Sequence, residues 1–231
     1  MNCWNSVNKI GTIKESSLHK SLKFSYCDSE KTEISVDGYV CDGQSDSGEL
    51  IEVQTGSFGP LKDKIKDLSK KKKVRIVYPV ILTKYIETYN TDKELLRKRK
   101  SPQKGSIWDL FDALIYAPDL CRSPRVTIEL VLLDIVEKRV DDGKGTWRRK
   151  GITIEDRIPV SWHKSVTLKK LNDYCLFIPF DENQCFTAKD LALNAGIPVH
   201  LSQKCLYVLY KVGFVERVGK EKNAHVYKKK R

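Results

Sequence analysis

The clearest pattern of apolar and polar positions lies in the first third of the chain. Residues 34–40 and 50–55 each alternate with a period of two, which is typical of half-buried strands. The segment 42–48 between them is rich in Gly, Asp and Ser and predicts a turn. Apolar residues at helical spacing in 58–73 predict a helix, and the continuous apolar run 74–81 predicts a buried strand. A hairpin, a crossover helix and a parallel strand together predict a mixed α/β sheet.

The register of the hairpin decides which side chains share a face. We expect Cys41 to lie opposite Gly48 across the turn. Asp37 then lies opposite Glu52, and both project from the same face as Gln54. Two carboxylates whose backbones are about 5 Å apart repel one another. A divalent cation is the simplest partner for them, because Mg²⁺ takes one or two carboxylates together with waters and substrate phosphates.

These residues resemble the motif of the PD-(D/E)XK nuclease superfamily, which includes restriction enzymes and junction resolvases. The motif consists of an Asp on one strand, Glu-x-Lys on the next strand, and an acidic residue on the first helix. Asp37 matches the Asp, and Glu15 in the predicted helix 9–25 matches the helical acid. Glu52-Val53-Gln54 matches Glu-x-Lys, with Gln in the Lys position. The resemblance covers about the first 100 residues.

The resemblance implies a restriction-endonuclease-like core and a set of site residues. Asp37, Glu52 and the main-chain carbonyl of Val53 are expected to hold Mg²⁺ or Mn²⁺. Glu15 is expected to support a second metal or its waters, and Gln54 to orient the attacking water. The metal would polarise the phosphate and lower the pKa of the water.

The chain departs from the motif at Gln54, because an amide orients water but supplies no positive charge. Some restriction enzymes of the superfamily also use Gln there. On the predicted helix that follows, Lys62, Lys64 and Lys66 are all candidates to supply the charge, and the sequence does not choose among them.

The chain also resembles a group of poorly characterised bacterial proteins. That similarity runs along most of the length and is carried by five short segments: 15–19, 36–40, 51–55, 99–102 and 147–151.

The composition favours a polyanionic partner. The 231 residues include 42 Lys and Arg against 30 Asp and Glu, a net charge of +12. Such an excess favours nucleic acid, because binding to the phosphate backbone releases counterions; DNA is expected rather than RNA. The run 70–73 is interpreted as a solvated helix end. The candidate nucleic-acid contacts of the first two thirds of the chain are Lys62, Lys64, Arg99, Lys100, Arg148, Arg149 and Lys150.

The middle of the chain is expected to be rich in β-structure. Residues 107–116 predict a packing helix, and 125–138 a long strand. The turn 141–145 and the returning strand 147–158 follow. This basic hairpin either follows a nucleic-acid groove or backbone, or is a solvated hairpin with Trp147 packed on its own sheet.

The C-terminal part resembles a winged helix-turn-helix. Thr187 is a helix N-cap for 188–195, a second helix is expected over 201–212, and strands 213–219 and 224–228 form a wing. The resemblance implies that the second helix enters the major groove and that the wing contacts phosphate. Many winged helices bind protein instead. The expected contacts are Gln203 and Lys204 on the helix, and Lys220 and Lys222 on the wing.

Several classes of protein are disfavoured. The seven cysteines are scattered without a Cys-x-x-Cys pair, which argues against zinc or disulfides. Neither a Walker loop nor Gly-x-Gly-x-x-Gly occurs. The chain lacks a run of 18 apolar residues, and its N-terminus lacks an apolar signal core. We therefore expect a cytoplasmic protein without a membrane partner.

The predicted organisation is a nuclease-like core over 1–105, a β-rich middle region over 106–182 that either stands apart or belongs to the core, and a winged helix over 183–231. The predicted function is that of a Mg²⁺-dependent endonuclease, a hydrolase of phosphodiester bonds, most consistent with DNA. A homodimer is compatible with this class, since nucleases that cut both strands often dimerise. The alternative is a non-catalytic DNA-binding protein or regulator on a degenerate nuclease scaffold, and a protein-interaction adaptor is a third hypothesis.

Overall fold

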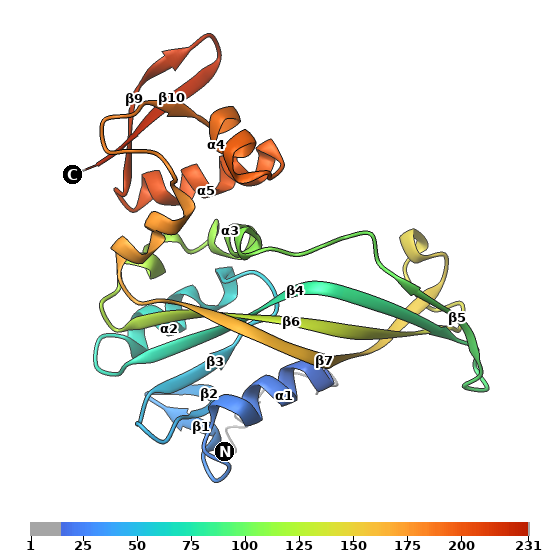
Figure 1. Ribbon diagram of the computed structural model, residues 1–231. Coiled ribbons are helices and arrows are strands. Elements are labelled where there is room, and N and C mark those ends of the chain that lie inside the picture. Colours follow the sequence, from blue (N-terminus) through green and yellow to red (C-terminus); the bar gives the residue numbers. More distant parts are fainter. Residues whose placement is uncertain (1–14, 231) are drawn as a thin grey trace, which may run out of the picture.

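A computed structural model describes residues 15–230 and shows a mixed α/β fold around one seven-stranded sheet (Figure 1). The strand order is β1-β2-β3-β4-β6-β7, with β5 paired to β4 beyond the end of β3. β3, β4 and β6 are parallel to one another, and the other pairs are antiparallel. The strands are β1 Thr32–Val36, β2 Tyr39–Gln44, β3 Leu50–Val53, β4 Val74–Tyr89, β5 Leu95–Lys100, β6 Val126–Asp141 and β7 Ile152–Leu168.

Helices cover both faces of the sheet. α1 lies on one face over a small cluster that includes Leu18, Leu22, Ile51 and Val53. The larger core lies on the opposite face, where α2, α3 and the C-terminal helices pack (Figure 1). The helices are α1 Ser17–Tyr26, α2 Lys62–Leu68, α3 Leu110–Leu114, α4 Ala188–Ala195 and α5 Val199–Lys211. The expected first helix thus begins at Ser17, and residues 9–14 of that prediction lie outside the described part of the chain.

The alternating segment 34–40 is two strands rather than one. Asp37 and Gly38 form a tight turn between β1 and β2, with φ of 48° and 84°. Two successive residues with positive φ fit a type I′ turn, for which Asp-Gly is a preferred pair. The alternation continues on either side of this pair, so the pattern alone concealed the turn. The second predicted turn, within 42–48, is present between β2 and β3.

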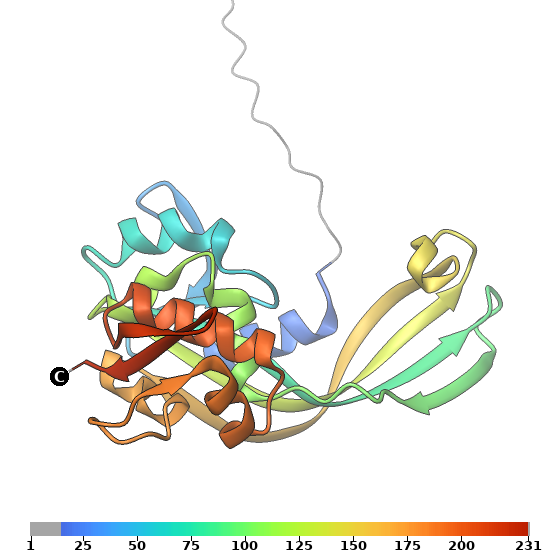
Figure 2. The same cartoon turned by 90° about the horizontal axis from the view of Figure 1, so that it is seen from above.

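β4, β6 and β7 are much longer than the body of the protein requires. They contain 16, 16 and 17 residues, and their distal halves form an arm together with β5 (Figure 2). The short 3₁₀ turn Trp147–Arg149 closes the arm at its tip. Because β6 pairs with β4 and β7 pairs with β6 in one sheet, 106–168 continues the core sheet and is not a separate unit. The basic segment 93–104 contains β5, which pairs with β4 on the edge of this arm.

The C-terminal part combines two helices with a small sheet. β8 Phe186–Thr187, β9 Val215–Glu221 and β10 Ala224–Lys229 form a three-stranded sheet in the order β8-β10-β9. Thr187 caps α4 by accepting from the Asp190 N–H, as its sequence context predicts. Leu206 and Leu209 of α5 are fully buried in the same cluster as Phe111 and Phe177. One apolar core therefore joins this part to the sheet-bearing body.

This shared core predicts a single unfolding transition for the whole chain. Phe177 is fully buried, with its ring 4.8 Å from that of Phe111 and 5.1 Å from that of Trp108. We expect Phe177→Ala to lower the free energy of unfolding by about 3–5 kcal/mol, because it leaves a cavity at the junction. Urea unfolding followed by tryptophan fluorescence and circular dichroism measures the change.

The matched control is Leu193→Ala on α4, since the Leu193 side chain is 86% exposed. Its unfolding midpoint should stay close to that of the wild type. Two separate transitions, of which Phe177→Ala shifts one alone, would contradict the shared core.

Candidate active site where β2 and β3 part

The candidate site lies where β2 and β3 separate. The two strands are joined by the pairs Gly43–Ile51 and Gln44–Leu50. Continuing this register brings Asp42 level with Glu52. The main-chain N–H of Val53 donates a hydrogen bond to Oδ2 of Asp42 at 2.7 Å. In a continuous antiparallel pair, a main-chain carbonyl of β2 would be the acceptor. The side chain thus replaces a main-chain ladder bond, and the carboxylate is held against the end of β3.

Asp37 is not the partner of Glu52, and the predicted register is wrong. Asp37 lies in the β1–β2 turn with its side chain 49% exposed, and its Oδ2 is 3.5 Å from Nζ of Lys71. Asp42, which the sequence pattern placed in a turn, occupies the position predicted for Asp37. The error follows from the concealed Asp-Gly turn, which shortens β1 and moves the pairing of β2 and β3.

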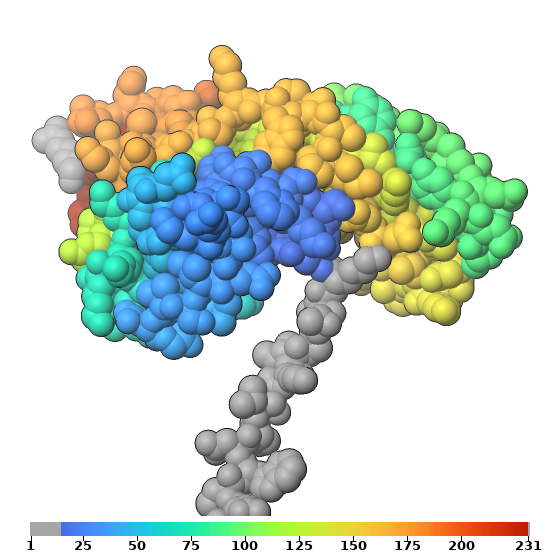
Figure 3. All heavy atoms as spheres, turned by 90° about the horizontal axis from the view of Figure 1, so that it is seen from below, coloured from blue at the N-terminus to red at the C-terminus, as the bar shows by residue number. Residues whose placement is uncertain are grey.

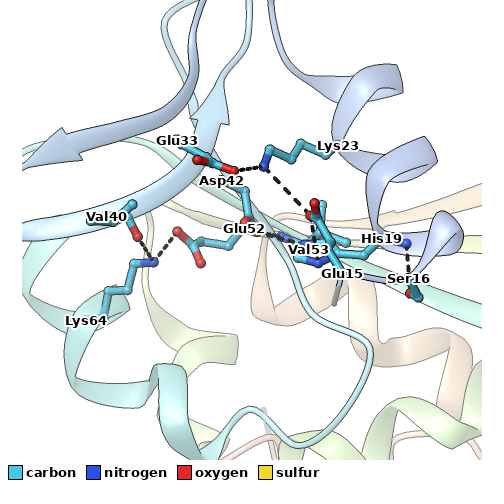
Figure 4. A network of polar contacts seen from close by, with 10 residues as sticks. All are labelled: Glu15, Ser16, His19, Lys23, Glu33, Val40, Asp42, Glu52, Val53 and Lys64. Atoms are coloured by element: carbon cyan, nitrogen blue, oxygen red, sulfur yellow. Dashed lines mark hydrogen bonds and ion pairs between the residues drawn. The ribbon is translucent and has the colours of Figure 1, made fainter. Parts of the chain in front are cut away.

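Glu52 is buried and is paired with a lysine from the next helix. The residue is 4% exposed, and its Oε1 lies 2.5 Å from Nζ of Lys64 on α2. The Lys64 ammonium also donates to the main-chain oxygen of Val40 at 2.6 Å (Figure 4). Burial raises the pKa of Glu52, and the hydrogen bond and charge of Lys64 oppose that rise. Lys62 and Lys66, the other two candidates on this helix, are exposed.

His19 links Asp42 to Glu15. Its Nε2 lies 3.3 Å from Oδ2 of Asp42, and its Nδ1 lies 3.2 Å from Oε1 of Glu15 (Figure 4). An imidazole with a carboxylate at each nitrogen is best satisfied when both nitrogens carry a proton. The hydrogen bond to Asp42 accordingly raises the pKa of His19, although burial opposes the rise.

The pKa of Asp42 shifts in the opposite sense to that of Glu52. Burial pushes the pKa of Asp42 upward, but the hydrogen bonds from His19 and the Val53 N–H outweigh burial and leave it lowered. Neighbouring carboxyls whose pKa values are driven apart by their surroundings are typical of sites that perform acid–base chemistry or hold cations.

Glu15 joins the site from just before α1. It precedes Ser16, the N-cap of α1, whose side chain accepts the His19 N–H. Besides His19, Lys23 approaches Glu15, with Nζ 3.7 Å from its Oε1, and the same ammonium lies 2.9 Å from Oε1 of Glu33. The predicted residues Glu15 and Glu52 are therefore in one polar network with Asp42, and the sequence pattern pointed to neither Asp42 nor Lys23.

Gln54 is directed into the loop that follows β3. Its side-chain amide donates to the main-chain oxygen of Ser57 at 2.5 Å. Its main-chain N–H donates to the main-chain oxygen of Val77. The amide is thus committed to its own loop. The cation beside Glu52 is Lys64 on the adjacent helix.

A cavity of about 260 Å³ lies past the end of β3. Leu18, next to His19, and Thr55, two residues beyond Val53, belong to its wall, so it adjoins the site. Its far wall is formed by Lys84, Glu137 and Arg157 at the base of the arm, with Asp109 nearby. Glu137 is 1% exposed and its pKa is lowered; burial opposes this, but hydrogen bonds from Arg139 and Arg157 and the charge of Lys84 prevail. Figure 3 shows α1 and the N-terminal strands (blue) beside the arm (green and yellow), with part of β7 (orange) between them.

The donor set suits a hard cation only in part. Within residues 15–230, no group of three or more His, Cys, Asp and Glu side chains is arranged to hold a metal ion. Mg²⁺ requires fewer protein ligands, because waters and substrate phosphates complete its shell. Asp42, Glu52 and the carbonyl of Val53 provide two carboxylates and one neutral oxygen of the right chemistry. Glu52 would have to share its carboxylate with Lys64.

Apart from Lys62 and Lys64 on α2, the predicted nucleic-acid contacts lie on three separate surfaces. Arg99 and Lys100 are exposed on β5, and Arg148, Arg149 and Lys150 lie at the tip of the arm. Trp147 beside them is 83% exposed, so it is not packed on its own sheet. In the C-terminal part, Gln203, Lys220 and Lys222 are exposed. Lys204 instead lies 2.6 Å from Oδ1 of Asp112 on α3, so it is paired with the body and is not free for a groove.

The contact between His19 and Asp42 predicts a measurable titration. We expect the His19 pKa, followed by NMR, to lie above the usual 6.5, and Asp42→Asn to lower it because the negative charge is removed. A raised pKa means that this contact stabilises the fold fully below pH 6.5 and that the stabilisation is lost as pH rises through the raised value. His225 is the internal control; partial desolvation and nearby Arg217 and Lys220 lower its pKa, and Asp42→Asn should not move it. An unchanged His19 titration in the variant would exclude the contact.

Comparisons with known proteins place the chain in a family whose function has not been assigned. The profile of a domain of unknown function, DUF8091, matches residues 16–169, which include Asp42, Glu52 and Lys64. An uncharacterised protein of Treponema pallidum (strain Nichols) is 30% identical over 201 residues, which cover 87% of this chain and 78% of that protein. No solved structure matches the chain. Among the described residues, no helix is long and apolar enough to cross a membrane. The chain belongs to the DUF8091 family.

Proposed function

We propose that the protein is a metal-dependent nuclease that hydrolyses phosphodiester bonds, with DNA as its substrate. The observation that carries this proposal is the meeting of three carboxylates and a lysine at the end of β3. They come from four successive parts of the chain: Glu15 before α1, Asp42 on β2, Glu52 on β3 and Lys64 on α2. The order of these elements, with a parallel β4 beside β3, resembles a restriction-endonuclease-like core in which the motif Asp is Asp42 and the motif Lys is replaced by Lys64.

The two central carboxylates are the proposed metal ligands. Asp42 and Glu52, together with the Val53 carbonyl, would hold Mg²⁺ or Mn²⁺. When bound, such an ion polarises a phosphate oxygen and lowers the pKa of a coordinated water. Asp42 is suited to this role because its lowered pKa keeps it ionised at neutral pH. Glu52 depends on Lys64 to remain ionised, because burial raises its pKa.

The cationic side chains near the proposed metal ligands have separate proposed roles. Lys64 stabilises the negative charge that develops as water attacks, a role that Gln54 cannot perform because it is neutral. His19 positions Asp42 and Glu15 by donating to both carboxylates. Glu15 would then support a second cation or its waters. Arg157 and Lys84 in the adjoining cavity are suited to a flanking phosphate of the substrate.

The C-terminal part is the proposed means of holding DNA. Residues 183–231 contain ten Lys and Arg against three Asp and Glu, which accounts for seven of the twelve excess positive charges. Two helices followed by a hairpin resemble a winged helix. Since α5 is packed on α3 and Lys204 is paired with Asp112, DNA contact would fall to the exposed Gln203 and to the hairpin residues Lys220 and Lys222.

A non-catalytic DNA-binding protein on a degenerate nuclease scaffold is the second candidate. It is favoured by Gln54, whose amide is bonded to Ser57 and which leaves the motif without its own lysine. The two candidates differ in divalent-metal binding at Asp42 and Glu52. Calorimetric titration with Mn²⁺ should show a site that Glu52→Gln abolishes if the protein is a nuclease, and no site at these residues if it is only a scaffold.

The first test of catalysis compares variants of the proposed metal ligands Asp42 and Glu52 with a variant of Asp37. Asp42→Asn and Glu52→Gln should each lower Mg²⁺- or Mn²⁺-dependent cleavage by a factor of at least ~100, because each removes a proposed ligand charge. Plasmid, single-stranded DNA and RNA are assayed side by side, so that the preferred substrate is identified. Binding of DNA in EDTA should be unchanged in both variants.

Asp37→Asn is the matched control, because it makes the same change at the exposed turn and Asn tolerates positive φ. It should cleave like the wild type. Loss of cleavage in Asp37→Asn with full activity in Asp42→Asn would overturn the proposed ligand set.

The second test concerns Lys64, the proposed replacement for the motif lysine. Lys64→Gln should lower the cleavage rate by about 10–1,000-fold, because the buried Glu52 loses its counter-charge and the attacking water loses its cation. Single-turnover rates are compared with those of Lys66→Gln, an equal charge change on the exposed side of the same helix. Equal rates in the two variants would remove Lys64 from the mechanism.

A further inference from the structure

A strongly basic groove lies at the opposite end of the parallel strands from the candidate site. Its lining combines seven Lys and Arg side chains with one carboxylate, Glu49, around a volume of about 600 Å³. The basic residues come from three segments that are far apart in the sequence: Lys71–Lys73 and Arg75 where α2 leads into β4, Arg125 before β6, and Lys169 and Lys170 after β7. The sheet brings them together because β4 and β6 start side by side, at Val74 and Val126, and Leu168 of β7 pairs with Ile128.

Two of the seven cations are fixed by the protein and form the floor of the groove. Arg75 donates to both Glu49 and Glu129. Arg125 donates to the main-chain oxygens of Ser69 and Lys70 at the end of α2, at 3.4 and 2.7 Å. These contacts hold the two guanidinium groups in place whether or not a ligand is present.

The remaining lysines are largely without counter-charge. Lys71 lies 3.5 Å from the exposed Asp37. Within residues 15–230, Lys72, Lys73, Lys169 and Lys170 form no salt bridge, and all four are exposed. Asp173 accepts the main-chain N–H groups of Lys169 and Lys170, and after these hydrogen bonds the charges of the two lysines also help to lower its pKa. Like charges gathered from separate segments repel one another, so this arrangement favours an anion that spans them.

The residues that line the groove indicate which class of anionic partner it binds. Its uncharged members are small and polar or ring-shaped, namely Ser47, Gly48, Pro124 and Thr127, so it has no large apolar group to insert into a lipid surface. Lysines spread along an open groove fit successive phosphates of a backbone better than a single compact anion. We propose that this groove binds the phosphate backbone of duplex DNA, several nucleotides away from the reacting phosphate; the inference rests on the proposed nucleic-acid function but not on cleavage.

The test separates binding from catalysis. Fluorescence anisotropy of a fluorescein-labelled duplex is measured in EDTA over a series of salt concentrations, with the full chain. The variant Lys72→Gln/Lys73→Gln/Lys169→Gln/Lys170→Gln should bind at least ten times more weakly than the wild type at low salt. The slope of log K against log salt should become shallower by about 0.9 for each phosphate that the variant no longer neutralises. The variant Lys66→Gln/Lys70→Gln, which changes exposed lysines outside the groove, is the control, and melting temperatures verify that each variant folds.

Each outcome decides one question. Weaker binding with a reduced salt slope supports the groove even if no substrate is ever cut, in which case only the nuclease proposal fails. Affinity and slope equal to those of the control overturn the groove, whether or not Glu52→Gln abolishes cleavage. Loss of binding to phosphatidylserine vesicles with unchanged DNA binding also overturns it, because the anion would then be a lipid headgroup.

Discussion

The candidate site depends on one hydrogen bond, from the Val53 N–H to the carboxylate of Asp42. In a continuous ladder this amide would find a carbonyl on β2, and the two strands would stay together. Because a side chain provides the acceptor, β2 and β3 part without leaving a buried donor unsatisfied. The same contact places the Asp42 charge beside Glu52. A strand that ended without this substitution would have to be covered by other residues, and the cavity beyond Thr55 would be closed.

Each carboxylate around this hydrogen bond has a cationic side chain close to it. Burial raises the pKa of Glu52, and the hydrogen bond and charge of Lys64 oppose that rise. Asp42 and Glu15 share His19, while Lys23 connects Glu15 to Glu33. Each carboxylate therefore has a cation that a divalent ion could displace or complement. These cations offset the repulsion among three acids at one strand end.

The sequence predicted the order of the central elements and two residues of the polar network, Glu15 and Glu52, but not the register of the hairpin. Alternation found β1 and β3 but reached only the first two residues of β2, helical spacing found α2, and Thr187 was correctly identified as the cap of α4. The Asp37-Gly38 turn was missed because the alternation of apolar and polar residues continues from β1 through the turn into β2. Choosing Lys64 over Lys62 and Lys66 required three-dimensional contact, since all three lie on one short helix. Joining 106–168 to the core sheet also required pairing across long sequence separations, which periodicity does not contain.

The rigid core sets what these surfaces can do together. Since α5 and the sheet share one apolar cluster, the C-terminal part keeps a fixed position relative to Glu52, unlike a domain on a linker. The basic groove begins where β3 begins, and the candidate site lies where β3 ends, three residues further on. At about 3.3 Å per residue that separation is on the order of 10 Å, less than the width of a duplex. If the proposed groove and the proposed site contact the same DNA, binding energy from the groove would act on the position of the phosphate at Asp42 and Glu52.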